Sequence, residues 1–104
     1  MIRSIKPEEA AQMLVEGAAL VDIREAPERA GGVIPGAESL PLSSLPGATV
    51  AGGGERPVIF HCRSGRRTET NAELLQQSAG APDVFLLEGG LDAWRAAGLP
   101  VTEV

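Results

Sequence analysis

The sequence predicts an α/β fold, a parallel, doubly wound sheet of about five strands flanked by helices on both faces. Three observations support this prediction. Short apolar runs occur at residues 19–21, 58–60 and 84–87, and each is followed by polar or glycine-containing residues. Segments with helical spacing separate these runs, and strands that alternate with helices form parallel sheets. The 104 residues suit one domain, residues 1–104, with a single core.

The first half of the chain predicts an edge strand, a helix and a second strand, followed by short turns and a long loop. Residues 2–5 predict a short edge strand, and Pro7 then suits the first position of a helix that Gly17 ends. Residues 19–21 predict the next strand. Further along, we expect a helical turn at 26–30, a short strand around Leu40, another turn at 43–45 and a long loop from Pro46 to Glu55.

The second half contains the most apolar strand and two further helices. Residues 58–60 predict a strand buried on both faces, because three large apolar side chains follow one another there. Helical spacing predicts a helix over 68–79 and another over 91–97, with a strand over 84–87 between them. Trp94 in the last helix is interpreted as a buried packing residue.

Composition excludes several classes of function. No apolar run is long enough to span a bilayer, and the start of the chain lacks the apolar part of a signal peptide. One cysteine permits no internal disulfide and no Cys-x-x-Cys pair, and a single histidine leaves no credible zinc set, so we expect no metal and no cofactor. The net charge of −5 argues against nucleic acid as a partner. We expect a cytoplasmic location, or a membrane-associated one if the chain is a domain excised from an anchored protein.

Residues 58–68, VIFHCRSGRRT, hold the candidate site. Cys62 follows the buried strand and precedes a helix, a place where backbone N–H groups converge and the helix dipole favours negative charge. A thiolate is such a charge, so this position predicts a nucleophilic Cys62. Arg63, Arg66 and Arg67 lie within five residues of Cys62 in an acidic chain, which suggests that an anion completes the site.

Two neighbouring features are interpreted as structural. Asp22 and Arg24 follow the strand at 19–21, where charged residues border the ligand edge of an α/β sheet, and we expect them to form an ion pair that holds a loop. His61 precedes Cys62, and successive side chains of a strand point to opposite faces. We therefore interpret His61 as structural rather than as a base that acts on Cys62.

Four ordered motifs resemble those of single-domain rhodanese-like sulfurtransferases over nearly the whole chain. They are Val21-Asp22-Ile23-Arg24-Glu25, Gly32-Val33-Ile34-Pro35-Gly36-Ala37, the loop Cys62–Arg67, and Leu87-Glu88-Gly89-Gly90 with Ala93-Trp94 and Ala97-Gly98-Leu99-Pro100-Val101. Among relatives the chain looks closest to the rhodanese domain of small bacterial membrane-anchored sulfurtransferases. Val33 and Arg29 depart from the family, which often has His and Tyr at these positions.

The resemblance implies a reaction and a set of residues. Cys62 would attack the outer sulfur of an anionic donor such as thiosulfate, release sulfite and keep a persulfide. A thiol, or cyanide, would then accept the sulfur. The substrate-binding residues would be those of the loop after Cys62, where Gly65 lets the chain turn: Arg63, Ser64, Gly65, Arg66, Arg67 and Thr68.

Two alternative functions remain open at this point. Cysteine-dependent phosphatases also hold oxyanions in a Cys-to-Arg loop, but their loop has one residue more than the four that separate Cys62 from Arg67. A shorter loop suits a sulfur atom better than a tetrahedral phosphate. The other alternative is a non-enzymatic module that carries sulfur or docks a partner, and the presence of Cys62 argues against a purely structural role.

Overall fold

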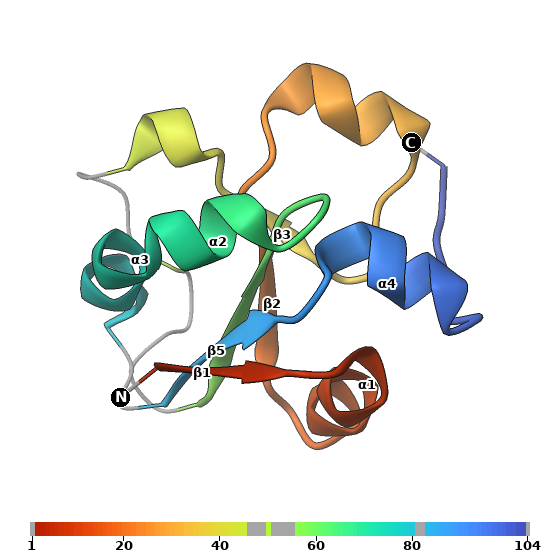
Figure 1. Cartoon of the computed structure of the whole chain (residues 1–104), viewed down its shortest axis with the longest axis horizontal. Helices are drawn as coiled ribbons and strands as arrows, with labels where there is room; N and C mark the ends of the chain where they lie inside the picture. Colours follow the sequence, from red (N-terminus) through yellow and green to blue (C-terminus); the bar gives the residue numbers. More distant parts are fainter. Residues whose placement is uncertain (1, 46–49, 51–55, 81–82, 104) are drawn as a thin grey trace.

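In the described part of the chain, five parallel strands form the sheet, in the order β1-β5-β4-β2-β3 (Figure 1). The computed structural model describes residues 2–45, 50, 56–80 and 83–103. The predicted α/β class and parallel sheet are therefore confirmed. The strands are β1 (Ile2–Ile5), β2 (Ala19–Asp22), β3 (Glu38–Ser39), β4 (Val58–His61) and β5 (Val84–Leu87).

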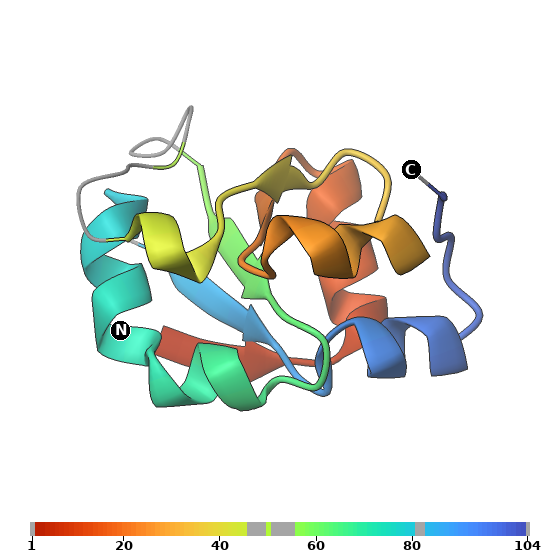
Figure 2. The same cartoon turned by 90° about the horizontal axis from the view of Figure 1, so that it is seen from above.

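Helices cover both faces of this sheet. Figure 1 shows α1 and α4 on one side and α2 and α3 on the other, and Figure 2 gives the same arrangement from above. Two short 3-10 helices, η1 and η2, lie beyond the β2–β3 edge. The helices are α1 (Pro7–Val15), η1 (Ala26–Gly31), η2 (Leu42–Ser44), α2 (Arg66–Thr70), α3 (Ala72–Ala79) and α4 (Gly90–Ala96).

The central strand β4 is buried on both faces, as its run of apolar residues predicts. Val58 and Phe60 pack with Leu75 of α3 in one apolar cluster. Ile59, between them in sequence, points to the other face and packs with Trp94 of α4. Trp94 is buried, as predicted, and its Nε1–H donates to the carbonyl of Pro100 at 2.7 Å.

The helix predicted over 68–79 is wrong in its extent, because the structure has two helices here. The chain is helical from Arg66 to Thr70, turns at Asn71 and is helical again from Ala72. Asn71 has φ −110° and ψ 21°, and its side-chain amide donates to the carbonyl of Arg67 at 2.8 Å. The backbone N–H of Asn71 donates to the same carbonyl at 3.0 Å, so the side chain and the backbone compete for one acceptor, a local contact that favours a break in the helix at this residue.

The remaining differences lie at element ends. The strand expected around Leu40 is at Glu38–Ser39, where its residues pair with Val21 and Asp22 of β2. The helical turn expected at 26–30 is the 3-10 helix η1, and the turn expected at 43–45 is η2. The predicted loop from Pro46 to Glu55 lies outside the described residues apart from Val50.

The carboxyl ends of β2 and β4 lie side by side, because Asp22 pairs in register with His61. Any group that follows either strand is therefore brought to the same edge of the sheet, the edge at which α/β proteins bind ligands. No helix within the described ranges has the length and apolar character needed to cross a membrane.

Candidate active site

Cys62 lies directly after β4 and is fully buried. The backbone N–H of Gly65 donates to the Cys62 sulfur at 3.1 Å, and α2 begins at the next residue. The loop therefore curls around the sulfur and directs at least one main-chain donor at it. This arrangement favours negative charge on the sulfur, because an amide N–H stabilises an anion that it faces.

Two glycines permit this loop to form. Gly65 has φ +90°, a left-handed conformation that other residues rarely adopt, and a Cβ at this position would lie 3.0 Å from the nitrogen of Gly89. Gly90 has φ +58°, and a Cβ there would lie 2.6 Å from the carbonyl oxygen of Cys62. The turn at Gly89–Gly90 thus packs directly against the backbone of the loop.

Helix α4 holds the loop through its first N–H groups. Leu91 N–H donates to the carbonyl of Cys62 and Asp92 N–H donates to the carbonyl of Arg63, both at 2.9 Å. On the other side, the hydroxyl of the buried Thr68 donates to the carbonyl of Gly65 at 2.9 Å. The carbonyls of Cys62, Arg63 and Gly65 are therefore bound by α4 and α2, which holds the loop in the shape that points the Gly65 N–H at the sulfur.

Arg67 lies between the thiol and a carboxylate that the sequence did not indicate. Its guanidinium donates to both oxygens of Glu28 in η1, at 2.7 and 2.8 Å. The hydrogen bonds that Arg67 donates to Glu28 raise the pKa of Arg67, burial opposes that effect, and the nearby Cys62 raises the pKa further. The same bonds from Arg67 hold the pKa of Glu28 below its ordinary value, against a smaller opposing effect of burial. Arg67 therefore stays charged beside the sulfur.

The other loop residues point toward solvent. The side chain of Arg63 is 73% exposed, and its one ion contact within the described residues is a long one of 3.7 Å with Asp92. Arg66 is exposed, and its backbone N–H lies 3.5 Å from the hydroxyl of the exposed Ser64. The structure thus brings Cys62, Gly65, Arg67 and Thr68 together, and places the side chains of Arg63, Ser64 and Arg66 on the surface around them.

The predicted ion pair between Asp22 and Arg24 is present and buried. Arg24 Nη2 lies 2.9 Å from Asp22 Oδ2, and the same guanidinium donates to the carbonyls of Glu28 and Gly32. Burial is the largest influence and raises the pKa of Asp22, but the hydrogen bonds from Arg24, the charge of Arg24 and the neighbouring His61 together outweigh burial and leave the pKa below its ordinary value. Arg29 contacts the same carboxylate at 3.4 Å. The pair therefore anchors η1, which carries Glu28, to the end of β2.

His61 has a structural contact, in agreement with the interpretation of the sequence. Its Nδ1 lies 3.0 Å from the carbonyl oxygen of Cys62, which requires the proton on Nδ1 for a hydrogen bond. Nε2 is buried, has no hydrogen-bond partner among the described residues and lies 3.8 Å from Asp22 Oδ2. Burial lowers the pKa of His61, and Asp22 offsets this only in part. A neutral ring follows from that balance.

The sequence analysis gave no individual role to two residues of this site, Glu28 and Gly90. Glu28 is 39 residues from Arg67, and no local pattern links them. Gly90 entered the sequence analysis only as part of the motif Leu87-Glu88-Gly89-Gly90, although two adjacent glycines after a strand that neighbours β4 indicate a close approach of two backbones. The described residues contain no group of three His, Cys, Asp or Glu side chains that could hold a metal ion.

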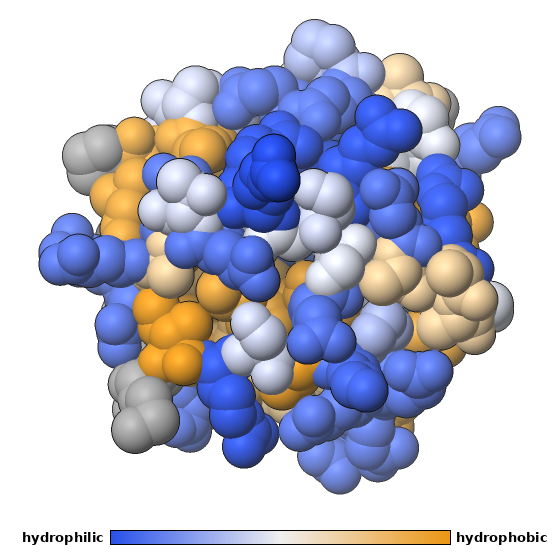
Figure 3. Space-filling view, in the orientation of Figure 1, coloured by the Kyte–Doolittle hydropathy of each residue, from blue (hydrophilic) through white to orange (hydrophobic). Residues whose placement is uncertain are grey.

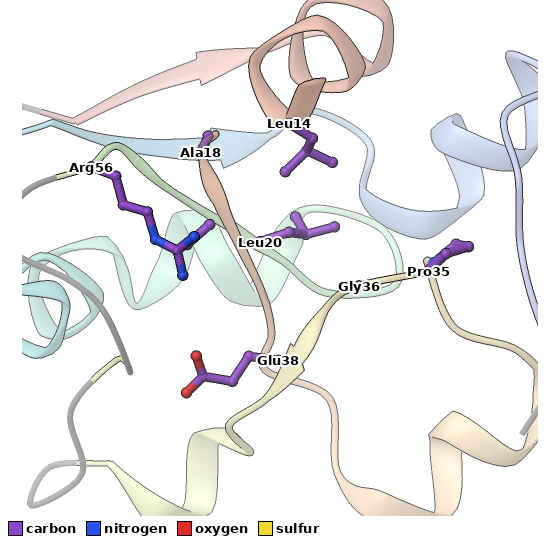
Figure 4. Close-up of a pocket in the computed structure, with 8 residues that line it drawn as sticks. Leu14, Ala18, Leu20, Pro35, Gly36, Glu38 and Arg56 are labelled. Atoms are coloured by element: carbon purple, nitrogen blue, oxygen red, sulfur yellow. The ribbon is translucent and has the colours of Figure 1, made fainter. Parts of the chain in front are cut away.

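A cavity of about 230 Å³ lies away from this site, near the amino ends of β2 and β4 (Figure 4). Leu14, Leu20 and Pro35 form apolar walls, and Glu38 and Arg56 carry charges on its rim. No residue of the Cys62 loop lines it. This cavity is therefore not part of the candidate active site.

A lone cysteine in a glycine-containing loop, between a buried parallel strand and a helix, defines an α/β protein with a cysteine-centred anion site. The profile of the rhodanese-like domain family matches residues 6–97, and the chain belongs to this family. A sulfurtransferase of Allochromatium vinosum is 39% identical over 104 residues, which cover 97% of this chain and 95% of the relative.

Two further comparisons agree with this family. The thiosulfate sulfurtransferase GlpE of Pseudomonas fluorescens is 36% identical over 93 residues, which cover 89% of this chain and 84% of that protein. The crystal structure of a rhodanese-related protein of Thermoplasma volcanium aligns with a TM-score of 0.83 at 26% identity, over 96% of this chain and 97% of that one.

Proposed function

We propose that this protein is a sulfurtransferase that moves a sulfane sulfur from an anionic donor such as thiosulfate to a thiol, or to cyanide, through a persulfide on Cys62. The rhodanese-like family and the sulfurtransferase relative support the general part of this conclusion. Thiosulfate as the donor is suggested by the similarity to GlpE. The observation that carries the proposal is the Cys62 sulfur that receives the Gly65 N–H beside the charged Arg67.

The proposed reaction has two steps. In the first, the Cys62 thiolate attacks the outer sulfur of thiosulfate, a new S–S bond forms, and sulfite leaves with the electron pair of the bond that breaks. In the second, an acceptor thiolate attacks the outer sulfur of the persulfide and returns the electron pair to Cys62. No other cysteine is present in the chain, so the acceptor comes from outside it.

The loop residues have separate roles in this proposal. The N–H of Gly65 and the guanidinium of Arg67 stabilise charge on the sulfur atoms during both steps. The exposed Arg63 and Arg66 attract the dianionic donor to the mouth of the loop. Figure 3 shows hydrophilic side chains gathered on the upper part of the face over η1 and the start of α2, a surface suited to an ionic substrate.

The thiol must be reduced to react, so the proposal includes a reducing compartment such as the cytoplasm. Cys62 also has no exposed surface in this structure. A substrate therefore reaches the sulfur only after the groups that bury it move.

The proposal is tested by mass spectrometry of the reduced protein after incubation with thiosulfate. We expect the mass to increase by one sulfur atom, and cyanide or a thiol to remove that increase. Cys62→Ser should form no adduct and show no turnover while it keeps the circular dichroism spectrum of the native protein, because the change is nearly isosteric.

The same preparation discriminates the two alternatives. Hydrolysis of an aryl phosphate through Cys62, without a sulfur adduct, would support a phosphatase and contradict the proposal. The absence of both reactions would favour a binding module. We expect negligible phosphate hydrolysis, because the loop is short for a phosphate.

A further inference from the structure

A cavity of about 320 Å³ lies beside the Cys62 loop, and the reaction described above does not use it. Its walls come from three elements that meet at the loop: η1, the first loop residues and α4. The cavity is lined mainly by Arg24, Glu28, Arg63, Leu91, Asp92 and Arg95.

The cavity shares its walls with the active site. Leu91 lines it and donates its N–H to the carbonyl of Cys62. Glu28 also lines it and binds Arg67, which lies against the Cys62 sulfur. The cavity therefore borders the loop that holds the reacting sulfur, although Cys62 itself does not line it.

Two arginines that line the cavity, Arg63 and Arg95, supply positive charge and have more N–H donors than their contacts with the described residues use. The third arginine, Arg24, donates its hydrogen bonds to Asp22 and to backbone carbonyls. Within the described residues, the Arg63 side chain has a 3.7 Å contact with Asp92, and Arg95 donates one hydrogen bond, to the carbonyl of Gly31 at 2.7 Å. A guanidinium has five N–H donors, so most of those on Arg63 and Arg95 are available for an anionic ligand.

Arg95 is held in place by the glycine turn beneath it. A Cβ at Gly32 would lie 2.6 Å from Arg95 Nη2, so the guanidinium packs against this glycine. The hydrogen bond to Gly31 keeps it there. Binding a ligand therefore requires little further ordering of this long side chain, which favours affinity.

The size and polarity of the cavity indicate which substrate it suits. Small organic ligands occupy cavities of about 300–1,000 Å³, whereas a water molecule takes roughly 30 Å³. A small oxyanion such as thiosulfate would leave most of this space empty. Five of the six lining side chains named above are charged, so an apolar ligand does not fit either.

We propose that this cavity binds the sulfur acceptor, and that the acceptor is a small organic thiol that carries a carboxylate. The inference rests on the proposed sulfurtransferase function and assigns its second substrate. The carboxylate pairs with Arg95 and Arg63, which places the thiol toward the Glu28–Arg67 side of the cavity. Its thiolate attacks the outer sulfur of the persulfide, the S–S bond to Cys62 breaks, and Cys62 leaves as a thiolate.

Steady-state sulfur transfer from thiosulfate to two matched acceptors tests this assignment. The acceptors are 3-mercaptopropionate and its methyl ester, which share a skeleton and differ in the carboxylate charge. In Arg95→Gln we expect the KM for the acid to rise about fivefold relative to the native protein, the size of one charge-assisted contact at a partly exposed site. The KM for the ester and the KM for thiosulfate should stay the same.

Two further variants control the experiment. Arg3→Gln removes an exposed arginine of β1 that does not line the cavity, and it should change no KM. Asp92→Asn removes a negative charge from the cavity wall, and it should lower the KM for the acid about two- to threefold without changing that for the ester. Because Asp92 is exposed on α4, this variant tests the assignment even if Arg95→Gln does not fold.

The outcomes separate the two proposals. Suppose that the Cys62 adduct forms, but that Arg95→Gln and Asp92→Asn change the KM for the acid and the KM for the ester by the same factor. The acceptor site is then refuted and the sulfurtransferase proposal stands. If thiosulfate forms no adduct on Cys62, both are refuted. A selective change for the acid in both variants, in opposite directions, supports the cavity as the acceptor site.

Discussion

The ion pair between Glu28 and Arg67 should stabilise the fold measurably, and Glu28→Gln tests this. The pair joins η1 to α2 through two hydrogen bonds of 2.7 and 2.8 Å. Glutamine keeps the size of the side chain and removes its charge. We expect the variant to unfold at a lower denaturant concentration than the native protein, with the same dependence of the unfolding free energy on denaturant.

The expected loss is about 1 kcal/mol, the upper end for exposed ion pairs. Two unit charges about 4 Å apart attract by roughly 4 kcal/mol at an effective dielectric constant of 20. Desolvation and the ordering of two long side chains offset most of that gain. The side chains remain 34% and 35% exposed, so solvent screens the pair, while its two-pronged geometry favours the upper end of the range. A loss of this size lowers the Tm by ~4–8 °C in a domain of about this length.

The stabilisation should also depend on pH with a definite sign. The pKa of Glu28 is lower in the folded protein than its ordinary value of 4.5, because Arg67 favours the charged form. The unfolded state therefore binds a proton first as the pH falls. The difference between native protein and Glu28→Gln should be constant above pH 4.5 and should disappear as the pH falls through the folded pKa of Glu28.

Chemical denaturation at several pH values measures these differences, and the chain offers a matched control. The pair between Arg3 and Glu9 has a contact of 3.4 Å, and its side chains are 65% and 51% exposed. Glu9→Gln should therefore cost close to nothing. A double-mutant cycle with Arg67→Gln isolates the coupling of the Glu28 pair. A coupling near zero at pH 7, or equal losses in Glu28→Gln and Glu9→Gln, would refute this reasoning.

Three further predictions follow from the site. Gly90→Ala should destabilise the protein by more than Gly80→Ala and slow adduct formation on Cys62. Both glycines have positive φ, but only at Gly90 would a Cβ meet the Cys62 carbonyl. Thermal denaturation and adduct rates measure these effects, and equal effects of the two substitutions would contradict the prediction. The lowered pKa of His61 means that the unfolded state takes up a proton first, so stability should fall as the pH drops below 6.5, and His61→Asn should remove that slope. Arg66→Gln should raise the KM for thiosulfate severalfold and leave that for a neutral sulfur donor unchanged, and similar changes for both donors would exclude an electrostatic role.

Local sequence patterns were sufficient for most of the fold. Apolar runs of strand length and helical spacing between them predicted the strands and the parallel sheet, since these patterns follow from which side chains a strand or helix can bury. They failed at Asn71, where a side chain competes with the backbone for a hydrogen bond. Periodicity does not report that competition, because it describes burial and not local polar contacts.

The candidate site, like the fold, could be predicted from the sequence only in part. The sequence by itself indicated Cys62 as the candidate nucleophile and determined the turn at Gly65 and the strand-to-helix setting, because all three depend on residues close together in the chain. Only the tertiary structure decided that Arg67 binds Glu28, that Gly90 packs against the Cys62 carbonyl and that Arg63 and Arg95 face one cavity. These contacts join segments far apart in sequence, and they arise from how η1, α2 and α4 pack at the end of the sheet, which no local pattern encodes.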